Sequence, residues 1–162
     1  MDDYILSICI PTYNRSETVY SHVVELLNNH EKDIEIVVTD DCSDDNTEEV
    51  LSSISDKRLK YVRNRERLGY GNLARSLKNG SGKYCLLLAD KDSVEYVDWN
   101  SVKNQLEEND DVSVFAFQYA DENGHVLIFP PQIKMPSCCY NTYNKFFYSF
   151  RYSGGIVKKR CA

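Results

Sequence analysis

Short apolar runs alternate with amphipathic stretches over most of this chain. Four runs have the length and composition of buried strands, at residues 4–10, 34–39, 59–63 and 84–89. Three stretches between them carry apolar residues at helical spacing, at residues 16–27, 44–54 and 69–79. Because strands that alternate with helices pair in parallel, the pattern predicts an open, mostly parallel, doubly wound α/β sheet flanked by helices.

The second half of the chain predicts a change of pattern. The run at 84–89 contains no polar residue, which favours an interior position in the sheet, whereas Pro11 is expected to stop the first strand. A helix, a strand, a turn and a returning antiparallel strand are then expected at residues 97–108, 112–119, 121–124 and 126–129. A further strand is expected at 154–159.

Acidic residues follow two of the predicted strands. Asp40 and Asp41 end the second run, and Asp90-Lys91-Asp92 ends the fourth. The carboxyl ends of strands in an open α/β sheet form a ligand crevice. Since buried carboxylates need a donor, a cation or a metal, the pattern predicts a site for a donor-rich or cationic ligand. A nucleotide base and ribose with a metal-bound diphosphate would satisfy it.

Composition and charge narrow the class of protein. The 162 residues suit one domain, residues 1–162, with 42% hydrophobic and 27% charged residues. A net charge of −6 argues against nucleic acid as a partner. No apolar run approaches the roughly 18 residues of a membrane span, and the acidic amino terminus is unlike a signal peptide. The expected location is the cytoplasm, either free or at the inner face of the membrane.

The six cysteines are expected to be free thiols. Cys9 and Cys85 lie inside apolar runs, where a reduced thiol acts as a small hydrophobe. The chain has no C-x-x-C pair and no His at zinc-ligand spacing from a cysteine pair. A disulfide and a metal site are the alternatives.

Four segments in order resemble the family 2 glycosyltransferases, the inverting enzymes of GT-A fold. LSICIPTYN at residues 6–14 looks like their first strand and P-T-Y-N loop, and VVTDDCSDDNT at 37–47 is similar to their V-D-D-G-S-x-D-N-T segment. Residues 64–72, with Gly82-Lys83-Tyr84, resemble their approach to the D-x-D motif, which is DKD at 90–92 here. The resemblance covers about residues 4–120 and implies a Rossmann-like, GT-A-like domain.

The resemblance also implies a function and residue roles. The donor would be a nucleotide-diphosphate sugar, commonly UDP-linked, and the sugar would be transferred with inversion to a hydroxyl of a glycan or lipid-linked acceptor in bacterial polysaccharide synthesis. Pro11, Thr12 and Tyr13 would border the base, with Asp40 also in the nucleotide site. Asp41 would accept a hydrogen bond from the uracil imide N–H, which cytosine does not offer.

The same resemblance places the diphosphate and its metal at the acidic motif. Asp90 would bind the ribose, and Asp92, with Asp90 beside it, would hold Mg²⁺ or Mn²⁺ against the diphosphate. The metal would stabilise the leaving UDP as a Lewis acid. Lys91 departs from the family's acidic motif, so either Asp92 is the ligand or the ammonium replaces part of the metal's charge.

The catalytic base of the family has no counterpart here and is expected beyond residue 162. The chain therefore reads as the donor-binding part of an enzyme, truncated on its acceptor side. A nucleotide-sugar-binding module without catalysis is the alternative. A receiver domain and a sugar nucleotidyltransferase are disfavoured, because Pro11 to Asn14 occupy the place where these need an acid pair or a Gly-rich loop.

Several sites have a plainer structural interpretation. Asp40 and Asp41 can cap the following helix, and Asp90 and Asp92 can be solvated turn acids. The basic run at residues 57–67 is expected to be mostly a solvated face, with Arg67 as its candidate phosphate ligand. His22 and His30 are expected on the surface. The aromatic segment 140–152 would line an acceptor groove or leave an apolar patch that favours self-association.

Overall fold

The computed structural model describes residues 4–29, 32–92 and 99–108, and the short strand segments 114–116, 119–120, 126–127 and 155–158. The strands are β1 (Leu6–Thr12), β2 (Ile34–Asp40), β3 (Leu59–Arg63), β4 (Tyr84–Leu87), β5 (Val114–Ala116), β6 (Tyr119–Ala120), β7 (Val126–Leu127) and β8 (Gly155–Lys158). The helices are α1 (Ser16–Asn29), α2 (Thr47–Ser52), α3 (Gly71–Asn79) and α4 (Trp99–Glu108).

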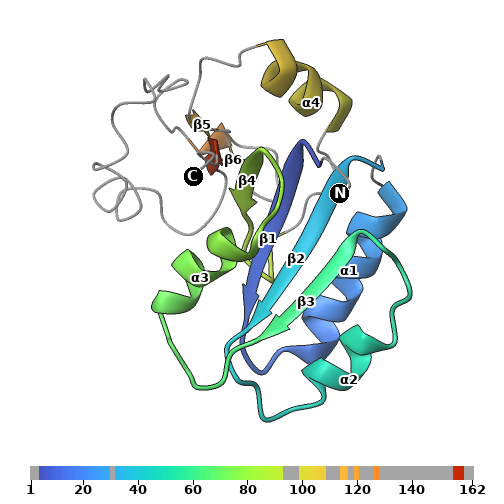
Figure 1. Ribbon diagram of the computed structural model, residues 1–162, viewed down its shortest axis with the longest axis vertical. Coiled ribbons are helices and arrows are strands. Elements are labelled where there is room, and N and C mark those ends of the chain that lie inside the picture. The colour runs from blue at the N-terminus through green and yellow to red at the C-terminus, as the bar shows by residue number, and fades with distance from the viewer. Residues whose placement is uncertain are drawn as a thin grey trace.

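One six-stranded sheet organises the molecule, in the order β3-β2-β1-β4-β8-β5. β1 to β4 are parallel, and β8 is antiparallel to both of its neighbours, β4 and β5. Figure 1 shows α3 on one side of the sheet and α1 and α2 on the other. The predicted parallel sheet, the interior place of β4 and the strand near residue 155 are confirmed. The strand predicted at 112–119 is instead two strands, β5 in the main sheet and β6, which pairs with β7 in a separate antiparallel sheet.

Pro11 does not stop the first strand, contrary to the prediction. β1 continues to Thr12, with Pro11 in register with Thr39 of β2. On the other side, the pairing of β1 with β4 ends at Cys9 and Leu87. Cys9 accepts a hydrogen bond from beyond β4, and Thr12 accepts one from beyond β2. Because successive residues alternate in direction, the nitrogen of Pro11 faces the β4 side, where no ladder bond is lost.

The two faces of the sheet bury different kinds of side chain. The face against α1 and α2 carries large apolar residues: Leu6, Ile8, Ile10, Ile34, Ile36, Val38, Tyr84 and Leu86, packed on Val19, Val23, Leu26 and Leu51. The face against α3 carries small or polar residues: Ser7, Cys9, Glu35, Val37, Thr39 and Cys85. The alternation of side chains along each strand produces this division, so an apolar run in the sequence contains both faces.

The connection from α3 to β4 passes very close to β1. The Gly82 N–H donates to the Ser7 hydroxyl at 2.8 Å, and a Cβ on Gly82 would lie 2.8 Å from the Ser7 nitrogen. Glycine is therefore required at position 82 by this close approach.

The described cysteines Cys9, Cys42 and Cys85 are thiols and not half-cystines, as predicted. The other three cysteines, and the 140–152 aromatic segment, lie outside the described residues. Within the described part of the chain, no helix is both long enough and apolar enough to cross a membrane.

Candidate functional site

The loops after β1 and β2 are locked together at the carboxyl ends of the sheet. The Asp41 N–H donates to the Thr12 carbonyl at 2.9 Å. The Asn14 N–H donates to the Ser43 hydroxyl at 2.9 Å, and the Asp44 N–H donates to the Asn14 side-chain oxygen at 2.8 Å. The P-T-Y-N loop and the acidic loop therefore form one structural unit.

This unit contains two residues in left-handed backbone conformation. Asn14 has φ 52° and Cys42 has φ 64°. Asn adopts this region readily, whereas a residue such as Cys occupies it at a cost. Asp45 holds the unit to both neighbouring helices, because it accepts the N–H groups of Ser16 and Thr47. Burial acts to raise the pKa of Asp45, but these hydrogen bonds lower it below its ordinary value.

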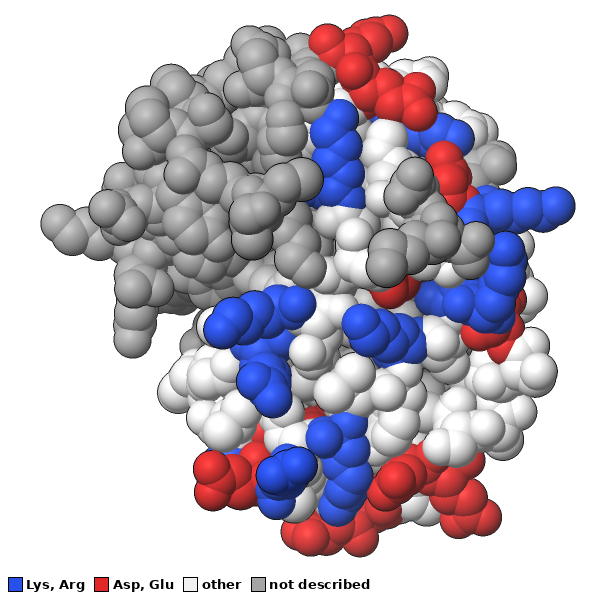
Figure 2. All heavy atoms as spheres, viewed as in Figure 1, with Lys and Arg blue, Asp and Glu red and all other residues white. Residues whose placement is uncertain are grey.

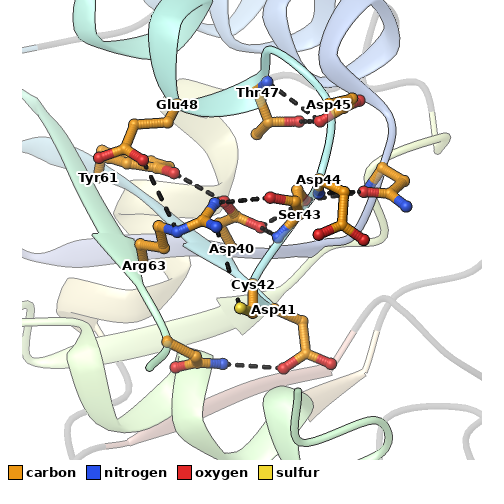
Figure 3. A network of polar contacts seen from close by, with 12 residues as sticks. Asp40, Asp41, Cys42, Ser43, Asp44, Asp45, Thr47, Glu48, Tyr61 and Arg63 are labelled. Atoms are coloured by element: carbon orange, nitrogen blue, oxygen red, sulfur yellow. Dashed lines mark hydrogen bonds and ion pairs between the residues drawn. The ribbon is translucent and has the colours of Figure 1, made fainter. Parts of the chain in front are cut away.

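Asp40 lies inside a network of protein donors (Figure 3). Its buried carboxylate accepts from the Ser43 N–H at 2.9 Å and from the Ser43 hydroxyl. It also accepts from the Tyr61 hydroxyl at 2.7 Å and the Arg63 guanidinium at 3.1 Å. Burial and the neighbouring Asp40 carboxylate raise the pKa of Tyr61.

The Asp40 side chain is 0% exposed. Direct contact with a nucleotide would therefore require the network to open. The contacts give Asp40 a positioning role, since they fix the start of the loop that carries Asp41. The contact of Asp40 with the Ser43 N–H closes a local turn and does not cap α2, which begins at Thr47 and whose first N–H is bound by Asp45 instead.

Asp41 points away from the Asp40 network, toward α3 (Figure 3). Its Oδ1 accepts from Asn64 Nδ2 at 3.0 Å and from the Leu68 N–H at 2.7 Å. Its Oδ2 accepts from the Gly69 N–H at 2.8 Å, with Gly69 at φ 56°. A carboxylate has about four acceptor positions, so Oδ2 keeps one for a further donor. Asp41 thus fixes the loop before α3, and its spare acceptor position belongs to a side chain that is itself buried, at 3% exposed.

Asp90 joins the end of β4 to the loop after β1. Its Oδ2 accepts from the Thr12 hydroxyl at 3.0 Å, and its Oδ1 pairs with Arg15 Nη1 at 3.1 Å. Asp90 is buried, which contradicts the solvated-turn interpretation for this residue. Asp92 is half-buried and Lys91 is exposed. The acidic motif therefore offers one enclosed and one accessible carboxylate.

Tyr13 and Arg67, predicted to contact the nucleotide, lie against each other. The Arg67 guanidinium carbon is 4.0 Å from the centroid of the Tyr13 ring, a cation–π contact. Arg67 precedes Leu68, whose N–H binds Asp41. The structure thus brings Thr12, Asp41 and Asp90 together at the carboxyl ends of the strands, with Tyr13 and Arg67 in the loops beside them.

The basic run is mostly exposed, as predicted, and Arg58 is its one half-buried cation. The Arg58 guanidinium donates to the Leu27 carbonyl and pairs with Asp56, each at 2.8 Å. Lys60 donates to the Asn79 carbonyl at 2.7 Å, and Arg63 belongs to the Asp40 network. Figure 2 shows basic side chains separated by uncharged surface on the face in view. Three of the six cations, Arg58, Lys60 and Arg63, therefore also make contacts within the fold.

His22 is buried, contrary to the prediction that it lies on the surface. It falls between Val19, Val23 and Leu26 on the apolar stripe of α1, a spacing that could have revealed its burial. Neither ring nitrogen has a hydrogen-bond partner of good geometry. Burial lowers the pKa of His22, while Glu25 and the nearby Asp90 and Asp92 act in the opposite direction.

The acidic motif suits a metal ion whose coordination is completed by substrate phosphates and water. Among the described residues, no three His, Cys, Asp or Glu side chains cluster closely enough to hold an ion. Mg²⁺ and Mn²⁺ commonly use one or two carboxylates together with substrate phosphates and water. Asp92 fits this requirement by its half-buried position, and Asp90, which binds Thr12 and Arg15, lies beside it in the motif.

Three features of this site were not predicted from the sequence. These are the pairing of Arg15 with Asp90, the Asn64 contact to Asp41, and the backbone donors of Leu68 and Gly69. Asn64 and Gly69 belong to the segment that supported the resemblance, but the sequence analysis predicted no contact for either residue. Arg15 gave no signal, because its partner is 75 residues away.

Comparison with known sequences finds a glycosyltransferase family model and glycosyltransferase relatives. The family model described as "Glycosyl transferase family 2" matches residues 7–156. The Escherichia coli UDP-Glc:alpha-D-GlcNAc-diphosphoundecaprenol beta-1,3-glucosyltransferase WfaP is 31% identical over 118 residues, covering 72% of this chain and 45% of the relative. The Campylobacter jejuni GalNAc(5)-diNAcBac-PP-undecaprenol beta-1,3-glucosyltransferase is 33% identical over 93 residues, covering 55% of this chain and 30% of the relative. The chain thus spans less than half the length of these relatives.

Solved structures share the fold. S. aureus TarS 1-349 in complex with UDP superposes with a TM-score of 0.61 at 24% identity, covering 76% of this chain and 38% of TarS. The Pyrobaculum calidifontis mannosyltransferase PcManGT, in complex with GDP-Man and Mn²⁺, gives 0.57 at 20% identity, covering 70% and 35%. At these identities the likeness supports the GT-A fold alone.

Proposed function

The chain belongs to glycosyltransferase family 2, and from this premise we propose that it is the donor-binding part of an inverting enzyme. The enzyme transfers a sugar from a UDP-sugar to a lipid-linked acceptor during synthesis of a bacterial cell-surface polysaccharide, at the inner face of the membrane. One observation carries the proposal: Tyr13, Asp41 and Asp90 converge at the carboxyl ends of three parallel strands, held by contacts between their loops.

The base binds beside Tyr13 and Asp41. The Tyr13 ring, with Arg67 against it, supplies an aromatic surface for stacking, and Pro11 and Thr12 border it. The remaining acceptor position on Asp41 Oδ2 receives the imide N–H of uracil. Asp40 acts indirectly, because its network fixes the loop that presents Asp41.

The ribose and diphosphate bind toward the acidic motif. Asp90 borders the ribose, and Asp92 holds Mg²⁺ or Mn²⁺ at the diphosphate. When bound, the metal neutralises the charge that develops on the departing UDP. The base that deprotonates the acceptor hydroxyl belongs to a part of the enzyme outside the described residues.

Calorimetric titration of the chain with UDP, GDP and CMP, with and without Mn²⁺, tests the donor site. We expect UDP binding that Mn²⁺ strengthens and that Asp41→Asn weakens at least about tenfold, since a charge-assisted hydrogen bond contributes about 1.5–3 kcal/mol. Glu49→Gln, which makes the same charge change on the exposed side of α2, is the matched control. Equal binding of the three nucleotides, or an unaffected Asp41→Asn variant, would contradict the uracil assignment.

A nucleotide-sugar-binding module without transfer activity is the second candidate. The exposed Lys91 in the acidic motif and the engagement of Asp90 by Arg15 favour it. Hydrolysis or transfer of UDP-sugars by the full-length protein separates the two candidates, because both bind the donor and only the enzyme consumes it.

A further inference from the structure

Arg15 forms an ion pair with Asp90 at the candidate donor site. It is the residue between the P-T-Y-N loop and the start of α1 at Ser16. Its guanidinium Nη1 lies 3.1 Å from Asp90 Oδ1, across 75 residues of sequence. The two side chains differ in exposure, with 48% for Arg15 and 11% for Asp90. An enclosed carboxylate is thus neutralised by a cation that remains in contact with water.

The enclosed carboxylate has no second ion pair among the described contacts. Its other oxygen accepts from the neutral hydroxyl of Thr12. A buried carboxylate without a counter-charge is costly, so Arg15 supplies the charge that this position requires. The adjacent Lys91 is exposed and forms no ion pair within the described part of the chain.

A divalent cation bound at the acidic motif would lie close to the Arg15–Asp90 ion pair. Asp92 lies two residues from Asp90 in the sequence, and a cation that Asp92 holds and that Asp90 joins in binding would repel the guanidinium at close range. Arg15 is able to leave, because its exposed guanidinium can be solvated without crossing the protein interior. The buried Asp90 cannot leave in the same way.

We propose that Arg15 is the built-in counter-ion of Asp90 and competes with the divalent cation for the acidic motif. The proposal deepens the proposed function, because it concerns the metal of the same donor site. Arg15 is a positioning residue: in the absence of metal it holds Asp90 against the β1 loop and lowers the affinity for free metal. Metal binding then becomes favourable mainly when the diphosphate of the donor arrives with it.

Manganese binding without nucleotide tests the competition. Free Mn²⁺ is measured by its electron paramagnetic resonance signal, which falls as the ion binds. We expect Arg15→Gln to bind Mn²⁺ about three- to fivefold more tightly than wild type, the size of a partly exposed ion pair. Arg15→Lys keeps the charge and should stay near wild type, and Asp90→Asn should weaken binding. Lys32→Gln, an exposed cation before β2, gives the same change in net charge and is the control.

Equal or weaker Mn²⁺ binding by Arg15→Gln, or equal gains in Arg15→Gln and Lys32→Gln, would overturn the proposal. The absence of Mn²⁺ binding in every variant would overturn it too. Circular dichroism confirms that each variant is folded. A parallel UDP titration of the wild type keeps the two hypotheses apart. If the wild type binds no UDP while Arg15→Gln still gains Mn²⁺ affinity, the donor site is refuted and the competition stands.

Discussion

The two faces of the sheet are buried by different interactions, apolar packing on one face and hydrogen bonds between polar side chains on the other. Against α1 and α2, the strands bury Ile and Leu side chains whose packing requires no specific partner. Against α3, they bury Ser7, Glu35 and Thr39, which depend on hydrogen bonds. Glu35 accepts from the Ser7 hydroxyl and from the N–H and hydroxyl of Ser81.

The polar face continues into the candidate site. Asn72 of α3 donates to the Thr39 carbonyl at 2.9 Å and accepts from Asn64 at 2.8 Å, and Asn64 in turn donates to Asp41. Hydrogen bonds fix direction, whereas apolar contacts mainly fix distance. We infer that the apolar face supplies most of the stability, and that the polar face positions Asp41.

Adjacent residues of β2 give the strongest test of this difference. Ile36→Ala removes a fully buried side chain from the apolar face and should lower the free energy of unfolding by about 3–4 kcal/mol. Val37→Ala, on the α3 face, should cost about 1.5 kcal/mol, because its cluster is small. Urea denaturation measures both, and equal losses would remove the energetic distinction between the faces.

Glu35 tests whether the polar face depends on its acceptor. Glu35→Ala leaves the Ser7 hydroxyl and the Ser81 N–H without their acceptor and should cost about 2–3 kcal/mol. Glu35→Gln keeps one acceptor oxygen and should cost about 1 kcal/mol. Both values come from the same urea transitions. A neutral Glu35→Ala variant would mean that water replaces the carboxylate freely at this edge.

His22 is a polar group that packs on the apolar face without a hydrogen bond. His22→Leu should therefore raise the free energy of unfolding by about 1 kcal/mol at neutral pH. Burial keeps the pKa of His22 in the folded chain below the ordinary 6.5, so the unfolded chain binds the proton first. The wild type should lose stability as the pH falls through about 6.5.

The contribution of His22 to the acid sensitivity is measured by comparing the wild type with His22→Leu. Urea unfolding of wild type and His22→Leu, from about pH 7.5 to about pH 5.5, should show a smaller loss for the variant. Parallel curves for the two proteins would assign the acid sensitivity to other groups.

A pair of serines on the α3 side gives the smallest expected effects, with opposite signs. The Ser76 hydroxyl is buried without a partner, so Ser76→Ala should stabilise the protein by about 0.5–1 kcal/mol. Ser81 donates to Glu35, so Ser81→Ala should destabilise it by about 1 kcal/mol. Thermal denaturation resolves both shifts, and a loss on Ser76→Ala would indicate a contact absent from this conformation.

Much of the fold was predictable because its signals are local. β3 has the predicted bounds, Leu59–Arg63, and β2 exceeds the prediction by the single residue Asp40. The errors occur where a local signal meets a neighbouring strand or helix. Pro11 continues β1 because β4 has ended on that side, and His22 is buried because α1 packs on the sheet.

The candidate site divides in the same way. The motifs around Tyr13, Asp41 and Asp90 identified segments that meet, since the carboxyl ends of parallel strands lie at one edge of the sheet. The resemblance singled out Asp41 as the base acceptor, but it gave no partners for either acid. Their side chains point to opposite faces, so Asp40 meets Tyr61 and Arg63 while Asp41 meets the loop before α3.

The sequence by itself determined the strands, the helices and the family, because hydrophobic period and motif order are properties of short segments. Only the tertiary structure decided which donors serve each carboxylate, and therefore which carboxylates remain accessible. Arg15 and Asp90 meet across 75 residues, and the Leu68 N–H meets Asp41 across 27. Hydrogen bonds require atoms placed to within a few tenths of an ångström, and strand register and helix packing set that precision.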